Sequence, residues 1–162
     1  RKQFKSILGD SFFITELNKT CIEEINTWNT GLNWSGLLQQ SNTFKPRHLG
    51  VAIFSVENDR QGAQLCGAAF GRTSRGHNKA SHVRIDYLAR APDPNPLAGY
   101  ITRIVLACAL RYAALTDKHR VLFTCPRKDD AIFNHFSRLF HGNYRRSDPN
   151  FPYDYFYMDL ES

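Results

Sequence analysis

Residues 82–90, HVRIDYLAR, carry the side chains best suited to acid–base chemistry. Polar and apolar residues alternate here, so His82, Arg84 and Asp86 share one face of a predicted strand. A charged stripe on a central strand is costly unless it borders a cleft or forms internal ion pairs. Asp86 is therefore the best candidate for a general base, with His82 beside it. A purely structural ion-pair network remains the alternative.

The stretch APDPNPLAG, residues 91–99, holds three prolines and ends at the start of a nearly uncharged helix. The unpaired backbone amides of a helix start, aided by the helix dipole, bind anions without charged side chains. Ala98 and Gly99 are small enough for backbone to approach a phosphate. The stretch predicts a site for a phosphorylated cofactor, and a turn that only stiffens a helix start remains the alternative.

Composition sets the frame for these two segments. The chain has 162 residues, 42% of them hydrophobic, with a formal net charge of +6. This length suits one domain, 1–162, trimmed at its N-terminus. The basic balance favours anionic partners.

No apolar run approaches the ~20 residues of a membrane helix, and we expect a cytoplasmic protein. Four widely spaced cysteines lack zinc spacing, so no metal site is expected.

The predicted elements alternate along the whole chain. Thr20 and Glu23 fit a capping box at the start of the first helix. The pattern predicts strands at 11–17, 49–58, 64–74, 81–91 and 119–126, helices at 17–28, 34–41, 99–116 and 128–140, and a closing hairpin after 142. The order β-α-α-β-β-β-α-β-α-β-β predicts an α/β (α+β) fold. We expect a mixed, mostly antiparallel central sheet with helices on both faces, and a parallel crossover between 81 and 126.

This order resembles the GCN5-related N-acetyltransferase (GNAT) superfamily, most clearly from about residue 64 to 160. The resemblance implies acetyl-CoA, or another acyl-CoA, as cofactor, with its pyrophosphate held by the loop PDPNPLAGYIT. Asn95 is the nearest polar match to the residue that opens the family's loop. The resemblance assigns cofactor binding to the loop and to flanking arginines, namely Arg90, Asn95, Leu97, Ala98, Gly99, Tyr100 and Arg103.

The same resemblance implies further roles. The pantetheine arm would pair with the backbone of Leu88, Ala89 and Arg90. The tyrosine that protonates the departing thiolate in the family is matched by Phe136, which has no dissociable proton. Other groups must then serve as the acid, among them Tyr100, Cys125, Tyr144 or water. The acceptor would contact Arg84, Tyr153 and Tyr155.

Three functions stay open at this point. The leading hypothesis is an acyl-CoA-dependent N-acyltransferase acting on an amine, which an aminoacyl-tRNA, a protein or a small molecule would carry. The second is a catalytically degenerate domain that binds CoA or a macromolecular partner, favoured by Phe136. The third is a nucleic-acid-binding or modifying domain on the same scaffold. We expect no membrane association, and a monomer or homodimer.

Overall fold

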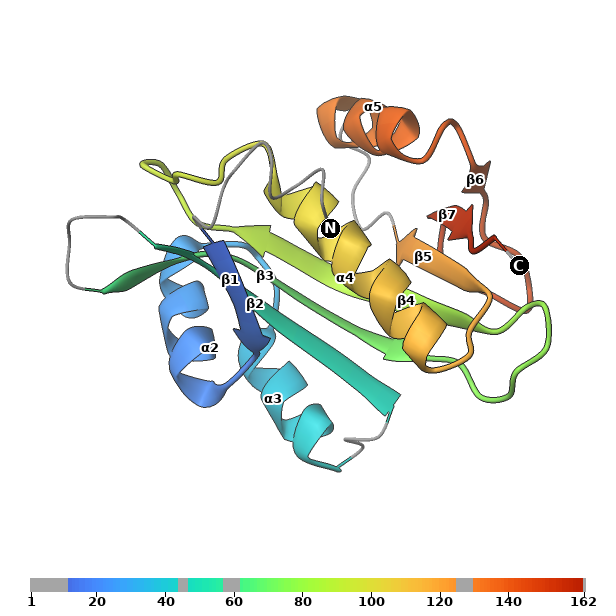
Figure 1. The fold of residues 1–162 in the computed structure, drawn as a ribbon, viewed down its shortest axis with the longest axis horizontal. Coiled ribbons are helices and arrows are strands. Elements are labelled where there is room, and N and C mark those ends of the chain that lie inside the picture. Colours follow the sequence, from blue (N-terminus) through green and yellow to red (C-terminus); the bar gives the residue numbers. More distant parts are fainter. Residues whose placement is uncertain (1–11, 44–46, 57–61, 125–129, 162) are drawn as a thin grey trace. The chain divides into compact units, whose positions relative to one another are not determined.

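The computed structural model describes residues 12–43, 47–56, 62–124 and 130–161. Figure 1 traces the elements along the chain. They are β1 (Phe12–Glu16), α2 (Lys19–Ile25), the short 3-10 helix η1 (Asn26–Trp28), α3 (Trp34–Thr43), β2 (His48–Val56), β3 (Ala63–Thr73), β4 (His82–Arg90), α4 (Ile101–Leu115), β5 (Arg120–Thr124), α5 (Asp130–Leu139), β6 (Tyr144–Arg145) and β7 (Tyr155–Asp159). The predicted order is confirmed, with η1 as an addition.

The strands are hydrogen-bonded in the order β1-β2-β3-β4-β5-β7-β6. β4 and β5 run parallel, with His82 opposite Arg120 and Ile85 opposite Phe123. β1 pairs with β2, and β7 with both β5 and β6, in antiparallel fashion. The mixed, mostly antiparallel sheet is therefore confirmed, and so is the parallel crossover from β4 through α4 to β5.

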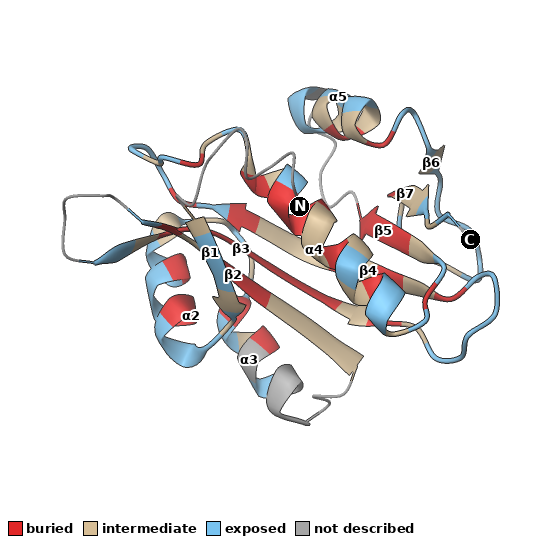
Figure 2. Cartoon of the chain, in the orientation of Figure 1, coloured by how far each residue is buried: buried red, intermediate tan, exposed pale blue. Residues whose placement is uncertain are grey.

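The chain forms two compact units, and β3, β4 and α4 contribute residues to both. The first unit comprises residues 1–70 and 87–107. Its core joins one side of α2 and α3 to the sheet, with Trp34 and Ile25 fully buried. Figure 2 shows buried residues on one side of α2 and exposed ones on the other. This one-sided burial is the amphipathic pattern that the sequence predicts for the first helix.

The start of that helix differs from the prediction. Asn18, not Thr20, is the N-cap residue, and its Oδ1 accepts a hydrogen bond from the backbone N–H of Cys21 at 2.9 Å. The predicted capping box of Thr20 and Glu23 is wrong, because the helix begins at Lys19. Asparagine caps as well as threonine or better, so the earlier residue takes the role.

The other side of the sheet in this unit faces the beginning of α4. A Cβ added at Gly67 would lie 2.7 Å from the Ile101 side chain, so the helix packs directly on the β3 backbone there. Ala68 follows Gly67 on β3 and belongs to the core with α2 and α3. Adjacent strand residues point to opposite faces. Helices thus cover both faces of the sheet in this unit. None of the described helices is long and apolar enough to cross a membrane.

The second unit comprises residues 71–86 and 108–162. Its core is aromatic: Phe136 of α5 and Phe140, just after α5, contact Phe123 of β5 and Phe156 of β7 edge-on or tilted. Phe136 is buried in this cluster. Side chains alternate along each strand, so the opposite face carries Arg120, Leu122 and Thr124 of β5 opposite Asp159, Tyr157 and Tyr155 of β7.

A close backbone approach joins β3 and β4 in this unit. A Cβ added at Gly71 would lie 1.9 Å from the carbonyl oxygen of Arg84. No side chain can occupy that space unless the two strands move apart. Gly71 therefore helps to set the position of Arg84, and of Asp86 two residues later.

We predict that Gly71→Ala lowers the free energy of unfolding by about 3 kcal/mol, at the upper end of overpacking effects, because the obstacle is backbone. Chemical denaturation of the two chains measures the loss. Ala63→Ser, at the exposed start of the same strand, is the control and should change stability by less than about 0.5 kcal/mol. Equal stability of Gly71→Ala and the unaltered chain would contradict the close approach.

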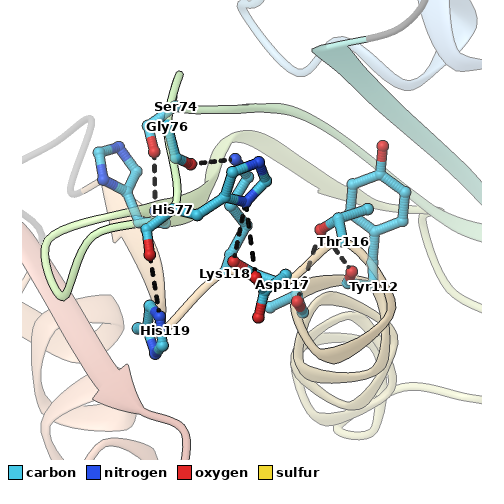
Figure 3. Close-up of polar contacts among 10 residues, drawn as sticks. Ser74, Gly76, His77, Tyr112, Thr116, Asp117, Lys118 and His119 are labelled. Carbon is cyan, nitrogen blue, oxygen red and sulfur yellow. Dashed lines mark hydrogen bonds and ion pairs between the residues drawn. The ribbon is translucent and has the colours of Figure 1, made fainter.

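A set of polar contacts ties the β3–β4 loop to the loop between α4 and β5 (Figure 3). Lys118 is buried, and its Nζ donates to the carbonyl oxygen of Gly76 at 2.6 Å. A ring nitrogen of His119 lies 3.2 Å from the carbonyl oxygen of His77. His77 in turn lies 3.8 Å from the Asp117 carboxylate. These contacts fix the loop that leads into β4.

We predict that Lys118→Met destabilises the chain by about 1.5–3 kcal/mol, the usual range for a hydrogen bond to a charged group. Methionine keeps the apolar stem but leaves the Gly76 carbonyl without its donor. Lys79→Met, an exposed lysine of the same loop, should have little effect. Thermal unfolding of both variants checks this, and equal melting temperatures would show that the buried ammonium adds nothing.

Candidate functional site

The turn before α4, in the first unit, is held together by Asn95. Its side-chain amide donates to the carbonyl oxygens of Cys66 at 2.9 Å and Ala91 at 3.1 Å. Its Oδ1 accepts from the backbone N–H of Leu97 at 3.0 Å. The polar atoms of Asn95 are therefore engaged by the protein. Its part at this turn is to order the backbone, and direct contact with a cofactor stays a prediction.

The amides that follow divide into two groups. The backbone N–H groups of Ala98 and Tyr100 donate to Asn95 and Leu97. Four other backbone N–H groups have no hydrogen-bond acceptor among the described residues: those of Gly99, Ile101, Thr102 and Arg103. We call these four amides the α4 start.

Gly99 has φ +85°, with nothing within 4 Å of an added Cβ. This conformation is open to glycine and strained for other residues. The Leu97 side chain, in contrast, is fully buried and serves the core. Thus the α4 start has an exposed glycine and several free donors, the features expected of an anion site.

The other residues assigned to a cofactor lie beside this turn in the chain. Leu88, Ala89 and Arg90 end β4, and the amide of the following Ala91 donates to the Cys66 carbonyl at 2.9 Å. The side chains of Arg90 and Arg103 are exposed. Backbone pairing of 88–90 with a pantetheine arm stays a prediction.

The second unit holds the predicted acid–base residues. Asp86 Oδ1 lies 2.7 Å from Nε of Arg84, and Asp86 Oδ2 lies 3.6 Å from Nε of Arg72. The Asp86 side chain is 14% exposed. We call Arg72, Arg84 and Asp86 the Asp86 cluster. Oδ2 is buried and accepts no hydrogen bond from the described residues.

Burial dominates the electrostatics of Asp86. Desolvation raises its pKa above the ordinary value of 3.8, although the charges of Arg84 and Arg72 act in the opposite direction. The charges of the two guanidiniums favour the ionised carboxylate, while burial makes it a stronger base than an exposed aspartate. A carboxylate in this state suits proton abstraction.

Aromatic rings cover Arg84. Its guanidinium carbon lies 5.5 Å from the centre of the Phe151 ring and 5.7 Å from that of Tyr153. Both rings lie within the range of cation–π contacts. The rings hold the guanidinium while its Nε meets Asp86. Of the predicted acceptor-contacting residues, Arg84 and Tyr153 are thus brought together.

His82 is placed as a neutral neighbour. Its Nδ1 lies 3.0 Å from the carbonyl oxygen of Ala80, and its ring lies edge-on to Phe151 at 6.2 Å. A carbonyl only accepts, so this hydrogen bond puts the proton on Nδ1 and leaves Nε2 free to accept another. Burial, with the charges of Arg84 and Arg120, lowers the pKa of His82. The ring is therefore neutral at pH 7, with its single proton on Nδ1.

The remaining predicted residues are dispersed. Tyr155 lies edge-on to Phe151, with the ring centroids 5.0 Å apart. Tyr100 belongs to the first unit and is partly exposed. Cys125 lies outside the described residues. Among the described residues, no group of three or more His, Cys, Asp or Glu side chains could hold a metal ion.

One member of the Asp86 cluster and one residue beside it were missed by sequence reasoning. Arg72 reaches Asp86 from the neighbouring strand, and Phe151 reaches both His82 and Arg84 from the segment before β7. Only the strand register could have placed Arg72 beside Asp86. No local sequence signal predicts the approach of Phe151, because its segment forms little regular structure.

Comparison with known proteins identifies the fold. No protein-family model matches the chain, and no curated protein sequence matches it. Solved structures do match. Spermidine N-acetyltransferase from Vibrio cholerae, in complex with CoA and spermine, gives a TM-score of 0.59 at 11% identity over 92% of this chain and 95% of that one. NAA60 from Arabidopsis thaliana, in complex with a bisubstrate analogue, gives 0.62 at 11% over 93% and 100%.

A GNAT family acetyltransferase from Listeria monocytogenes gives a TM-score of 0.57 at 11% identity, over 94% of this chain and 96% of that chain. These similarities cover nearly the whole of each protein. The chain therefore has the GNAT fold, as its order of elements predicts, in a highly divergent sequence.

We predict that the Asp86 carboxyl titrates above pH 3.8 and that Arg84→Gln raises its pKa further, because Arg84 is the main group that opposes the effect of burial. Carbon-detected NMR of the side-chain carboxyls measures both pKa values. The control is Asp154, whose pKa is lowered chiefly by the backbone N–H of Ser147. Its titration should be the same in both chains. An Asp86 pKa that falls in Arg84→Gln would contradict the assignment.

Proposed function

We propose that the chain is an acyl-CoA-dependent N-acyltransferase, with acetyl transfer from acetyl-CoA to an amine as its reaction. The observation that carries this proposal is the α4 start: free backbone amides beside a glycine at φ +85°, on a GNAT fold. The solved neighbours support it, because spermidine N-acetyltransferase of this fold was crystallised with CoA.

The residues of the α4 start fit the phosphates of CoA. Four amide donors at the beginning of a 15-residue helix would hold the pyrophosphate, and the helix dipole adds a favourable field. Arg90 and Arg103 would add positive charge nearby. In this proposal the prolines fix the turn, Asn95 fastens it to the neighbouring backbone, and Gly99 leaves the approach open.

When bound, acyl-CoA supplies a thioester whose C–S bond breaks as the amine nitrogen bonds the acyl carbon. The amine must first lose its ammonium proton, and Asp86 is the group we assign to accept it. His82 Nε2 is the second acceptor on the same strand face. Asp86 and Arg90 lie four residues apart on β4 without a break.

The acid that protonates the departing thiolate has no assignment at position 136. Phe136 is packed among Phe123, Phe140 and Phe156, so its ring belongs to the core and reaches no reacting group. Of the acids that the sequence suggests, Tyr100 and Tyr144 lie among the described residues and carry a hydroxyl, and water is the third source. A thiolate leaving group needs less assistance than an alkoxide, since an ordinary thiol has a pKa near ~8.5.

We predict that Gly99→Val weakens CoA binding at least ~10-fold, because a β-branched residue cannot readily hold φ +85° and the amides would turn away. Isothermal titration calorimetry of CoA into both chains measures the change. Gly76→Val is the matched control, since Gly76 also has a positive φ, +79°, in the β3–β4 loop. Equal losses in the two variants would mean general strain rather than a cofactor site.

We also predict that Asp86→Asn lowers turnover about 100-fold or more, in the range for loss of general base catalysis, while CoA affinity is kept. Release of free CoA thiol measures turnover, and calorimetry measures affinity. Asp159→Asn is the control, because Asp159 also pairs with an arginine, Arg120, on this sheet. Undiminished turnover in Asp86→Asn would remove the assigned base. Tight CoA binding without turnover in any chain would instead support a degenerate CoA-binding domain.

A further inference from the structure

The charges around Asp86 bear on the acceptor. Arg72 and Arg84 each contact Asp86, and His82 beside them is neutral, so the Asp86 cluster carries one net positive charge. Arg120 adds a more distant positive charge that acts on His82 and is itself paired with Asp159. An acceptor that brings two or more positive charges would be repelled at this place.

Arg84 keeps its outer edge available. Its Nε meets Asp86 and its guanidinium lies against the Phe151 and Tyr153 rings. Its terminal nitrogens have no acceptor among the described residues, and the side chain is 17% exposed. Arg72 is paired with Asp86 through its buried Nε, and its side chain is 39% exposed. Planar guanidinium edges of this kind bind carboxylate or phosphate oxygens in pairs.

Asp86 shows the complementary feature. Its Oδ2 is buried and accepts no hydrogen bond from the described residues, and Nε of Arg72, 3.6 Å away, is likewise buried without one. The side chain is 14% exposed, and an ammonium group that reaches it would form a charge-assisted hydrogen bond with the carboxylate. One carboxylate that suits an ammonium group and two guanidiniums that suit an anion thus lie within one cluster of three residues.

Resting on the proposed N-acyltransferase activity, we propose that the acceptor is a zwitterion, an amine with an oxyanion a few bonds away, as in a free α-amino acid. Its ammonium group meets the partly exposed Asp86 carboxylate, and its oxyanion meets the outer edges of Arg84 and Arg72. The exposed Tyr153 ring lies against the guanidinium of Arg84. Arg84 and Arg72 are then the residues that select against polyamines and other multiply charged cations.

The test compares acceptors that differ in one group. The CoA-loaded chain is given free L-α-amino acids, the matching amino-acid amides, an aminoalkyl phosphonate and spermidine. Thiol release with acetyl-CoA measures transfer, and calorimetry with CoA present measures binding. We expect each amino acid to exceed its amide at least tenfold in kcat/KM or affinity. The phosphonate arm decides whether the oxyanion is a carboxylate or a phosphate.

Variants tie the preference to the cluster. Arg84→Gln should reduce the acid-to-amide ratio at least fivefold, and Arg72→Gln, at a more exposed site, provides a second variant should Arg84→Gln not fold. Arg111→Gln, an exposed arginine on α4, is the matched control and should keep the ratio.

The outcomes separate this proposal from the proposed function. If amino acids bind in an arginine-dependent way but no thiol is released, the result supports a zwitterionic ligand and contradicts the N-acyltransferase activity. If transfer to spermidine or to amides is as fast as transfer to amino acids, the result supports the N-acyltransferase activity and overturns the proposal of a zwitterionic acceptor. Neither transfer nor arginine-dependent binding of any acceptor by the CoA-loaded chain would overturn both.

Discussion

Strand β4 has one buried apolar face and one face that carries charged side chains, and the rest of the structure depends on this constraint. β4 lies between β3 and β5, and its Val83 and Ile85 side chains are fully buried on one face. On the other face Asp86 is desolvated and must be compensated. Arg84 supplies one guanidinium from the same strand and Arg72 a second from β3. The close backbone contact at Gly71 holds these two strands at the distance that this pairing needs.

The two candidate sites use different kinds of groups, since one relies on backbone amides and the other on side chains. At the α4 start the useful donors are backbone amides, so the sequence around them need only provide a turn and a glycine. In the Asp86 cluster the useful groups are side chains, so their identities matter. A divergent sequence can keep the first kind of site with few recognisable residues, which is consistent with a GNAT fold at 11% identity.

Periodicity predicted most of the fold, because each element buries one face. The strict alternation of 82–90 predicted β4, and the parallel β4–β5 pairing followed from the buried helix between them. The same alternation put His82, Arg84 and Asp86 together. It could not place Arg72 or Phe151, whose contacts depend on strand register and on an irregular segment. It also chose the wrong cap for α2, since Asn18 and Thr20 both suit that role.

The central claim is that the α4 start binds the phosphates of CoA, and amide NMR tests it most directly. The isotopically labelled chain is titrated with CoA and, separately, with pantetheine, which lacks the pyrophosphate. The account predicts that the amides of Gly99, Ile101, Thr102 and Arg103 show the largest shifts with CoA and small ones with pantetheine. CoA binding that leaves these four amides unchanged, or no binding at millimolar CoA, would contradict it.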